Sequence, residues 1–229
     1  MICARCFLRH GTAVPQPRGT RMRLFLLGAT GRTGRLVLQQ ALARGHAVTA
    51  IVRAASALDT FNAHASRDLR IVVGNPLASE ALAPQLRGHD VLVSCLGQRS
   101  RRDATVPHQG AAAALDAMAR SGIRRYLVIS QGLLFPSGNP LIALLRFILA
   151  RHVADSEAME RLVRSSAVDW TIVRPPRLVE GAAPRGYRAK SGALPGRGLT
   201  MQYADLAAFL VDEAERQDHR RQVVGVAPK

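Results

Sequence analysis

The feature that most constrains this chain is a glycine-spaced turn near its start. Leu24–Leu27 is a short apolar run, and Gly28, Gly31 and Gly34 follow it at a regular spacing. A helical pattern then covers 35–44 and ends at Gly45, a residue that commonly terminates helices. Glycines between a strand and a helix let the backbone approach a phosphorylated ligand and let the helix pack on the strand. The fold is therefore expected to start as strand, ligand-binding turn and helix.

The rest of the chain alternates short apolar strands with helices. Strands are expected over 48–52, 69–73, 91–96, 126–129, 170–173 and 223–226, and helices over 79–86, 111–120, 155–164 and 204–215. Continuous apolar strands that alternate with helices indicate a parallel sheet covered on both faces, and right-handed crossovers make it doubly wound. We predict an α/β chain with a doubly wound parallel sheet, the Rossmann fold, as a single domain over 22–229.

Residues 1–21 do not share this pattern. We expect a disordered leader or a misassigned start, with translation beginning at Met22, because the segment has too few apolar residues to order itself. Its arginines and lack of acids also fit a targeting segment, although an apolar core is missing. Cys3 and Cys6 have the spacing of a metal-binding pair, but no second pair follows at a zinc-finger distance. We predict no metal site.

Composition narrows the partners and the compartment. The net charge is +16, yet the arginines are scattered and aromatic residues make up only 4% of the chain, so no nucleic-acid partner is predicted. Three cysteines provide no disulfide framework, which favours the cytoplasm. The most apolar stretch, Leu141–Ala150, is interrupted by Arg146 and is too short to span a membrane. It is expected to be a buried or amphipathic helix, and no membrane partner is predicted.

The glycine turn, in its strand and helix context, predicts a nicotinamide dinucleotide as cofactor. A chain that binds NAD(H) should carry Asp or Glu at the end of the second strand. Arg53 stands there instead, Arg32 lies inside the turn, and the first acidic residue is Asp59. Two guanidinium groups suit the 2′-phosphate of NADP(H). The alternative is that Arg53 only reflects an arginine-rich composition. We predict NADP(H).

Several runs together carry a family resemblance: LFLLGATGRTG, AVTAIVR, VVGNP, VLVSCLG, YLVISQG and DWTIVRPP. From about residue 22 to the C-terminus the chain resembles the atypical short-chain dehydrogenase/reductase family with an NAD(P)H-binding domain. It is most similar to the biliverdin reductase B/flavin reductase and NmrA-like members. The resemblance implies that Asn75 contacts adenine, although the family usually has Asp there. It also implies that Cys95–Gly97 lie along the riboses, with Ser130 and the proline pair near the nicotinamide.

The predicted cofactor site combines the turn, the strand-two arginine and these strand ends. Its residues are Gly28, Thr30, Gly31, Arg32, Thr33, Gly34, Arg53, Asn75, Cys95, Leu96, Gly97, Ser130, Pro175 and Pro176.

Catalytic groups are harder to find. No tyrosine is followed four residues later by lysine, so the acid–base pair of classical superfamily members is absent. The candidate catalytic residues are Ser130, Gln131 and His108. His108 is expected in a loop after the fourth strand, Arg99–His108, which could cover the substrate, but an ordinary solvent-facing histidine is the alternative; the same holds for His152. Cys95 is expected to be a small buried apolar residue.

These observations lead to one function hypothesis and two alternatives. The first is an NADPH-dependent reductase that transfers hydride to a planar conjugated small molecule such as a flavin, quinone or linear tetrapyrrole, which needs little acid–base help. The second is a non-catalytic NADP(H)-binding sensor of the NmrA-like type. The third is an epimerase or dehydratase acting on a nucleotide-sugar. A monomer or homodimer is expected.

Overall fold

A computed structural model describes residues 21–54, 67–97, 105–181, 185–196 and 199–229. Of the predicted leader, only Arg21 lies within these ranges, and its guanidinium donates to the carboxylate of Asp68. The expectations for residues 1–20 lie outside the described part of the chain.

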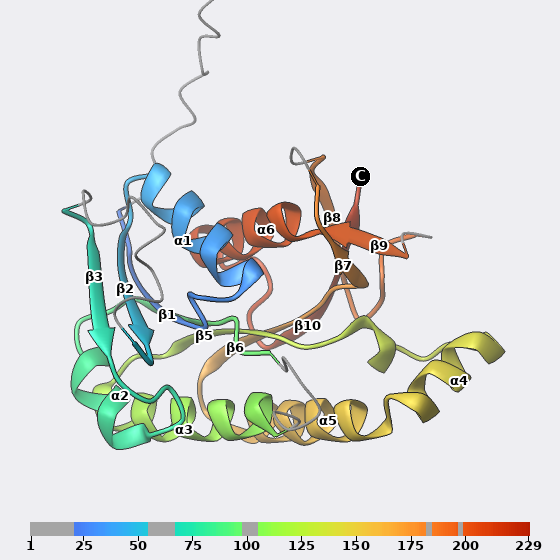
Figure 1. Cartoon of the computed structure of the whole chain (residues 1–229), viewed down its shortest axis with the longest axis horizontal. Helices are drawn as coiled ribbons and strands as arrows, with labels where there is room; N and C mark the ends of the chain where they lie inside the picture. Colours follow the sequence, from blue (N-terminus) through green and yellow to red (C-terminus); the bar gives the residue numbers. More distant parts are fainter. Residues whose placement is uncertain (1–20, 55–66, 98–104, 182–184, 197–198) are drawn as a thin grey trace, which may run out of the picture.

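Strands and helices alternate along most of the chain (Figure 1). The strands are β1 Arg23–Leu27, β2 Ala47–Val52, β3 Leu69–Val73, β4 Val91–Ser94, β5 Arg125–Ile129, β6 Asp169–Arg174, β7 Arg177–Val179, β8 Tyr187–Ser191, β9 Thr200–Gln202 and β10 Gln222–Pro228. The helices are α1 Arg32–Ala43, α2 Ser79–Leu86, α3 Val106–Ser121, α4 Pro140–Ile148, α5 Ala150–Ser165 and α6 Tyr203–Arg216, and Gly132–Leu134 forms a 3₁₀ turn.

Eight strands form the central sheet in the order β3-β2-β1-β4-β5-β6-β10-β8. Neighbours from β3 to β10 are parallel, and only β8 at the edge runs antiparallel to β10. The order reverses direction at β1 and β4. In such sheets ligands bind at the carboxyl ends of the strands, next to this switch point. The prediction of a single-domain, doubly wound Rossmann fold is confirmed.

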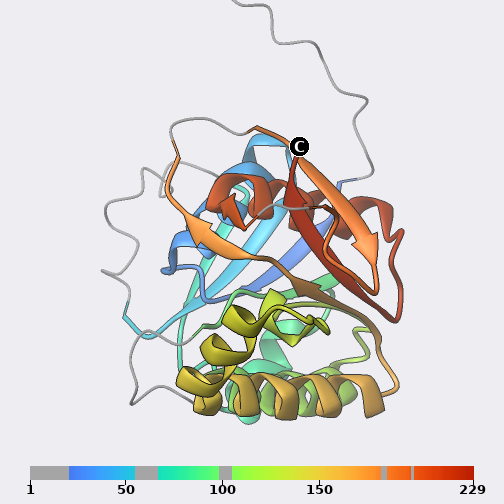
Figure 2. The ribbon, with the colours of Figure 1, turned by 90° about the vertical axis from the view of Figure 1, so that its right-hand side faces the viewer.

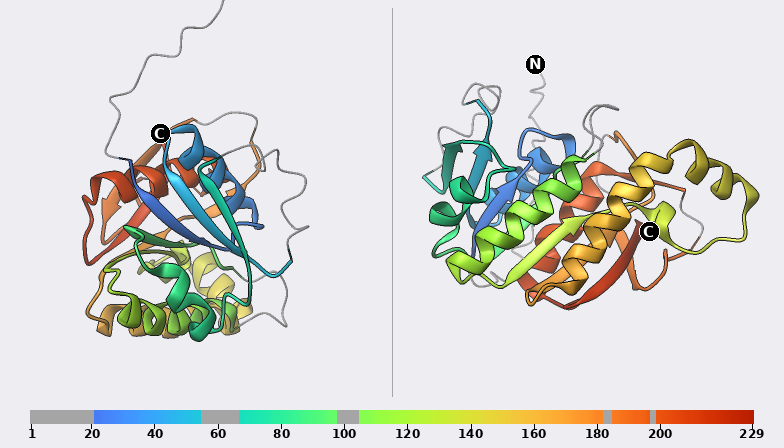
Figure 3. Two further views of the ribbon diagram at one scale, coloured as in Figure 1. Left: turned by 90° about the vertical axis from the view of Figure 1, so that its left-hand side faces the viewer. Right: turned by 90° about the horizontal axis from the view of Figure 1, so that it is seen from below.

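Two apolar layers cover the two faces of the sheet. Helices α1 and α6 lie on one face, and α2, α3 and α5 lie on the other (Figures 1 and 3). Side chains of β1 alternate between them: Leu24 and Leu26 pack in the α1/α6 layer, while Phe25 and Leu27 pack in the other layer. This alternation follows from the pleat of a strand and explains why both-sided burial required a continuous apolar run.

The structure departs from the sequence prediction at several elements. Strands β7, β8 and β9 were not predicted, and β8 makes the sheet mixed rather than wholly parallel. These strands have three to five residues, too few to show an apolar periodicity, and β8 is largely exposed. Helix α3 begins at Val106 rather than at residue 111, since Pro107 is tolerated in a first turn. Helix α4 lies where a buried or amphipathic helix was expected, and the buried alternative was wrong, since none of its residues is buried.

A buried ion pair joins the sheet to α6. The Arg125 side chain on β5 is 4% exposed, that of Glu213 on α6 is 2% exposed, and their charged atoms lie 2.6 Å apart. Arg125 also donates to the Thr171 hydroxyl and the Asp169 carbonyl. Burial lowers the pKa of Arg125 to about 10, an effect that the nearby Glu213 carboxylate opposes. The pair is therefore a structural tie whose two members depend on each other.

Removing Glu213 should destabilise the fold strongly. Glu213→Ala leaves the Arg125 guanidinium buried without its carboxylate, so we expect the free energy of unfolding to fall by about 3–5 kcal/mol in denaturant titrations. The matched control is Asp116→Ala, which breaks the exposed Asp116–Arg120 pair of α3 and should cost less than about 1 kcal/mol. Equal losses in the two variants would contradict the role given to the buried pair.

Candidate functional site

The turn between β1 and α1 is built so that only glycine fits at its two ends. Gly28 has φ +78°, and a Cβ there would lie 2.6 Å from the Cys95 carbonyl oxygen. A Cβ on Gly34 would lie 2.1 Å from the Gly28 carbonyl oxygen. Both contacts are with backbone and cannot be relieved by a side-chain rotation. The turn is thereby pressed against the carboxyl end of β4, and α1 against the turn.

The first turn of α1 is electropositive. Gly31 is its N-cap and provides no capping side chain, and the first turn contains no acidic residue. The first intrahelical hydrogen bond of the helix runs from the Arg35 N–H to the Gly31 carbonyl at 2.9 Å, so the preceding N–H groups at Arg32–Gly34 have no carbonyl of the helix to donate to. Within the described residues the buried Arg35 Nε also has no hydrogen-bond partner. Such an end suits a pyrophosphate, so the turn fits the dinucleotide that the sequence predicted.

Arg53 and Asn75 follow the neighbouring strands β2 and β3 at this same edge of the sheet. The Gly74 N–H donates to the Val52 carbonyl at 2.8 Å, which keeps the two strand ends together. Arg53 is exposed. The Asn75 side-chain oxygen accepts from the Leu77 N–H at 3.0 Å, so it caps its own turn and only its NH₂ group remains to donate to a base.

Arg32 has protein partners that the sequence did not predict. Its Nη1 donates to the Tyr203 hydroxyl at 3.2 Å, and its guanidinium carbon lies 5.5 Å from the centre of that ring. Its Nε lies 3.5 Å from a Glu180 oxygen, with both side chains well exposed. A carboxylate at this distance competes with a phosphate for the guanidinium. Arg32 is therefore a weaker candidate for the 2′-phosphate than Arg53.

The segment after β4 lies against the glycine turn. Cys95 follows β4 directly and its N–H donates to the Leu27 carbonyl at 2.9 Å. Cys95 is half-buried as a residue, and burial raises the pKa of its thiol to about 12, so the thiol is protonated at neutral pH. Leu96 contacts α3 where Gly110 leaves room for it, and Gly97 is exposed with open space at its Cα. A protonated thiol at the end of β4 is in keeping with the small apolar residue that the sequence led us to expect there.

Ser130 and Gln131, at the end of β5, are both attached to α5. The Ser130 hydroxyl donates to Glu160 Oε1 at 2.7 Å. The Gln131 amide donates to the Ser156 hydroxyl at 2.9 Å and to the His152 carbonyl at 3.1 Å. The Ser130 N–H in turn donates to the Val173 carbonyl at 2.7 Å. These bonds fix both side chains relative to β6 and α5.

Glu160 is the centre of this network. Its carboxylate accepts from Arg174 Nε and Nη2 at 2.8 and 2.7 Å, and from Arg164 Nη2 at 2.8 Å. Burial acts to raise the pKa of Glu160, but the hydrogen bonds from Arg174 and Ser130 outweigh it and leave the pKa below its ordinary value. The carboxylate is therefore ionised at neutral pH, and the Ser130 proton is committed to it.

Arg174 ends β6 next to Pro175, the first of the predicted proline pair. Its guanidinium carbon lies 4.7 Å from the centre of the Phe135 ring. The Gly132 N–H donates to the Pro175 carbonyl at 2.7 Å, so the segment after β5 runs beside Pro175. The structure thus brings Ser130, Gln131 and Pro175 together at the carboxyl edge of the sheet, as the sequence predicted.

His108 is not in a loop. It lies in the first turn of α3, where its backbone N–H contacts the carboxylate of the buried Asp155 at 3.4 Å. The loop prediction was wrong because Pro107 lies in the first turn of the helix, where proline is tolerated, instead of preceding the helix. Most of the predicted cover, Arg99–His108, lies outside the described residues. His152 lies on α5 and is half-buried.

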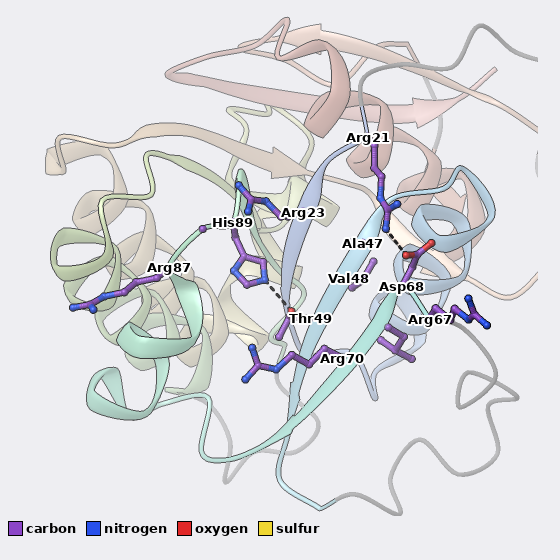
Figure 4. A pocket seen from close by; sticks show the side chains of 12 residues that line it. Arg21, Arg23, Ala47, Val48, Thr49, Arg67, Asp68, Arg70, Arg87 and His89 are labelled. Atoms are coloured by element: carbon purple, nitrogen blue, oxygen red, sulfur yellow. Dashed lines mark hydrogen bonds and ion pairs between the residues drawn. The ribbon is translucent and has the colours of Figure 1, made fainter.

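A hollow lies at the edge of the sheet opposite the glycine turn, at the amino ends of β1, β2 and β3. It has a volume of about 280 Å³ and is lined by Arg21, Arg23, Ala47, Val48, Thr49, Arg67, Asp68, Leu69, Arg70, Arg87, Gly88 and His89. Figure 4 shows Arg67 and Arg87 extending toward opposite sides rather than converging. His89 Nε2 lies 2.8 Å from the Thr49 hydroxyl. Burial lowers the pKa of His89. The hollow is separate from the glycine turn and is not part of the candidate site.

Sequence reasoning missed the residues that support the predicted ones, above all Glu160, Arg174, Phe135 and Tyr203. One signal was present. Arg174 ends an apolar strand that is buried on both faces, and a buried arginine needs a carboxylate partner. Glu160 stands on the preceding helix in the position to supply it. Among the described residues, no cluster of three or more His, Cys, Asp or Glu could hold a metal ion.

Comparison with known proteins agrees with the fold. YwnB of Bacillus subtilis, an uncharacterised protein, is 24% identical over 214 residues that cover 88% of this chain and 96% of YwnB. The anaerobillin reductase ChuY of Escherichia coli has the same fold, with a TM-score of 0.74 and 21% identity over 90% of this chain and 97% of ChuY. SP1627 of Streptococcus pneumoniae, provisionally called an NADH-flavin reductase, gives a TM-score of 0.73 and 22% identity. The match covers 91% of this chain and 100% of SP1627.

The family model for NAD(P)H-binding proteins matches residues 28–217. The match begins at the first glycine of the turn and includes the strand ends that gather around it. The resemblance inferred from the sequence motifs is confirmed at this level, and the chain belongs to the NAD(P)H-binding family.

Proposed function

We propose that this chain is an NADPH-dependent reductase of a planar conjugated acceptor such as a flavin, a quinone or a linear tetrapyrrole. The observation that carries the proposal is the hydrogen bond from Ser130 to Glu160 at 2.7 Å. It occupies the one proton that the side chain at the end of β5 could give. A reaction at this edge therefore has to proceed without a protein acid from β5, which favours acceptors that solvent can protonate.

The residues of the site then have positioning roles. The turn Gly28–Gly34 and the α1 N-terminus would hold the pyrophosphate, and Arg53 would pair with the 2′-phosphate. When bound, the dinucleotide supplies the hydride. Ser130, Gln131 and Pro175 would form the surface on which the reacting rings lie, with the apolar Leu96 beside the glycine turn. Arg174 lies behind this surface, where Glu160 balances its charge.

The preference for NADPH rests on charge. Arg53 is exposed at the end of β2, where an acidic residue would serve NAD(H). The name of SP1627 mentions NADH, whereas the charges of this chain favour the 2′-phosphate. We therefore keep NADP(H) as the proposed cofactor and a small molecule as the partner. Cys95 is a free thiol, in keeping with the cytoplasm that we expect.

A non-catalytic NADP(H) sensor of the NmrA-like type is the second candidate. The same attachment of Ser130 and Gln131 to α5 favours it, because both side chains are occupied by structural bonds. The atypical short-chain dehydrogenase/reductase subgroup that we infer contains both kinds of protein. Turnover decides between them.

The proposed function is tested by following the oxidation of NADPH, through its absorbance, with a panel of flavins, quinones and tetrapyrroles as acceptors. We expect at least one acceptor to be reduced. Ser130→Ala and His108→Ala should each retain turnover within about tenfold, since neither residue is the proton donor. A loss on the order of 10²-fold in His108→Ala, with NADPH affinity intact, would identify His108 as the acid. Tight NADPH binding with no turnover on any acceptor would favour the sensor.

Reversing the charge of Arg53 should separate the two cofactors. Arg53→Asp replaces an attractive partner of the 2′-phosphate with a repulsive one, so NADPH binding should weaken by about 2 kcal/mol or more while NADH binding changes little. Isothermal titration gives both affinities. The control is Arg87→Asp at the opposite edge of the sheet, which makes the same change in net charge and should leave both affinities within about twofold. Wild-type protein that binds NADH as tightly as NADPH would refute the role of Arg53.

Glu160→Gln should weaken the support of the site. The amide keeps a partner for Ser130 but leaves Arg174 without a carboxylate, so we expect a loss of about 3 kcal/mol of stability. Because the folded-state pKa of Glu160 is lowered, its contribution is complete above the unfolded value of about 4.3 and is lost as the pH falls through the folded value. The free energy of unfolding should be measured for both proteins from about pH 7 to about pH 3. The difference in this free energy between wild type and Glu160→Gln should become smaller as the pH falls. A difference in stability that stays the same at every pH would mean that the ionised carboxylate of Glu160 is not its cause.

A further inference from the structure

The Ser130 hydroxyl at the end of β5 has already given its only hydrogen away. It donates to Glu160 Oε1 at 2.7 Å. The reverse direction is excluded, because the Glu160 carboxylate also accepts from Arg174 Nε and Nη2 at 2.8 and 2.7 Å and is ionised, so that it has no hydrogen to return. No described residue donates to Ser130 Oγ. The lone pairs of this oxygen therefore remain to accept a hydrogen bond from a ligand.

The Gln131 side chain is in the same state. Its amide nitrogen carries two hydrogens and donates to the His152 carbonyl at 3.1 Å and to the Ser156 hydroxyl at 2.9 Å. A backbone carbonyl can only accept, so the nitrogen of the Gln131 amide, and not its oxygen, must face His152. No residue in the described ranges donates to the amide oxygen, Oε1. Gln131 can thus accept from a ligand but has no side-chain hydrogen left to donate.

One face of α5 holds both side chains in place. Their partners belong to His152, Ser156 and Glu160, which recur every four residues, a spacing that puts them on one face of the helix and about 6 Å apart along its axis. Figure 2 shows α5 below the sheet, on the side opposite α1 and α6. None of the helices in the described ranges is long and apolar enough to cross a membrane, and α5 uses this face for hydrogen bonds. Ser130 and Gln131 are themselves half-buried, so a ligand at the carboxyl edge of the sheet can reach them.

The ligand group that fits two free acceptor oxygens is one that brings N–H hydrogens. Arg53 follows β2, whereas Ser130 and Gln131 follow β5, on the other side of β1 and β4. A dinucleotide lies across the switch point of such a sheet with its pyrophosphate at the glycine turn, so an adenosine half at Arg53 puts the nicotinamide half over β4 and β5. The nicotinamide ring carries a carboxamide, whose NH₂ group has two hydrogens to donate. A carbonyl group at this place would meet only lone pairs.

We infer that Ser130 Oγ and Gln131 Oε1 hold the nicotinamide ring by accepting from the NH₂ group of its carboxamide. The two residues are then positioning residues, and Gln131 does not direct the carbonyl of an acceptor, because its own hydrogens are committed to α5. The direction of the dinucleotide rests on the function proposed above, in which Arg53 binds the 2′-phosphate. The assignment is the same for a reductase and for a sensor, since it concerns binding and not turnover.

Two analogues of NADP⁺ test this inference by isothermal titration, without turnover. The acetylpyridine analogue has a methyl group in place of the NH₂ group, whereas the thionicotinamide analogue keeps the NH₂ group and exchanges the carbonyl oxygen for sulfur. We expect the wild-type protein to bind the acetylpyridine analogue about tenfold more weakly than NADP⁺, because two acceptors lose their donors. The thionicotinamide analogue should bind within about threefold of NADP⁺.

Variants show whether these two oxygens cause the difference. Ser130→Ala/Gln131→Met removes both acceptors with little change in size, so it should bind NADP⁺ and the acetylpyridine analogue within about threefold of each other. The matched control is Ser156→Ala, which removes one partner of the Gln131 amide and leaves both acceptor oxygens, so it should keep the ratio of about tenfold. The fragment 2′-phospho-ADP-ribose, which has no nicotinamide, should bind all three proteins equally and so reports any general damage to the site.

The outcomes separate this inference from the proposed function. Equal binding of NADP⁺ and its acetylpyridine analogue to the wild-type protein would overturn the inference, as would a ratio that persists in Ser130→Ala/Gln131→Met. Failure to bind any nicotinamide dinucleotide would overturn it together with the proposed cofactor. If the wild-type protein prefers NAD⁺, the NAD⁺ analogues should give the same ratio, because both cofactors carry the carboxamide, and only the role of Arg53 would be lost. The expected ratios with no acceptor reduced would refute the reductase alone.

Discussion

The carbonyl group of Gly28 is the contact on which the cofactor side of this protein depends. It accepts from the Gly31 N–H at 3.0 Å, and the backbone of Gly34 approaches it so closely that a Cβ would lie 2.1 Å away. Gly28 itself is pressed against the Cys95 carbonyl. One peptide group therefore sets the distances between β1, α1 and β4. Because those distances are set by backbone contact, the N-terminus of α1 can have only one position above the edge of the sheet.

The other half of the site is organised by charge instead of contact. Glu160 connects α5 to the end of β5 through Ser130 and to the end of β6 through Arg174. A steric constraint is indifferent to pH and salt, whereas this network exists only while the carboxylate is ionised. The same hydrogen bonds explain why this half of the site is fixed in place yet offers no obvious proton donor. Its polar side chains, Ser130 and Gln131, are bonded to α5.

The sequence predicted the parts of this arrangement that have a local cause. The glycine spacing located the turn because backbone approach requires glycine, and apolar strands located the sheet because burial on both faces requires it. Arg53 was found from its place at the end of the second strand, whereas Asn75, Cys95, Ser130 and Pro175 came from the family resemblance. The structure places all five at the carboxyl edge because parallel strands end there together. Glu160 and Tyr203 were missed because their roles come from partners distant in the chain, Arg174 and Arg32. His108 was misplaced because a proline such as Pro107 can stand either in a loop or in the first turn of a helix. Helix α4 was found in its place, but its burial was not predictable because apolarity alone does not say what covers a residue.

The protonated state of Cys95 affects which acceptors the crevice can tolerate. Burial holds the pKa of the Cys95 thiol far above neutral pH, and the thiolate is the form that attacks electrophiles and peroxide. Quinones alkylate thiolates, and reduced flavins give peroxide with oxygen. A cysteine held in its neutral form gives such compounds little to react with. Burial at the end of β4 would thus leave this edge of the sheet with little thiolate to react with the class of molecules that we propose it reduces.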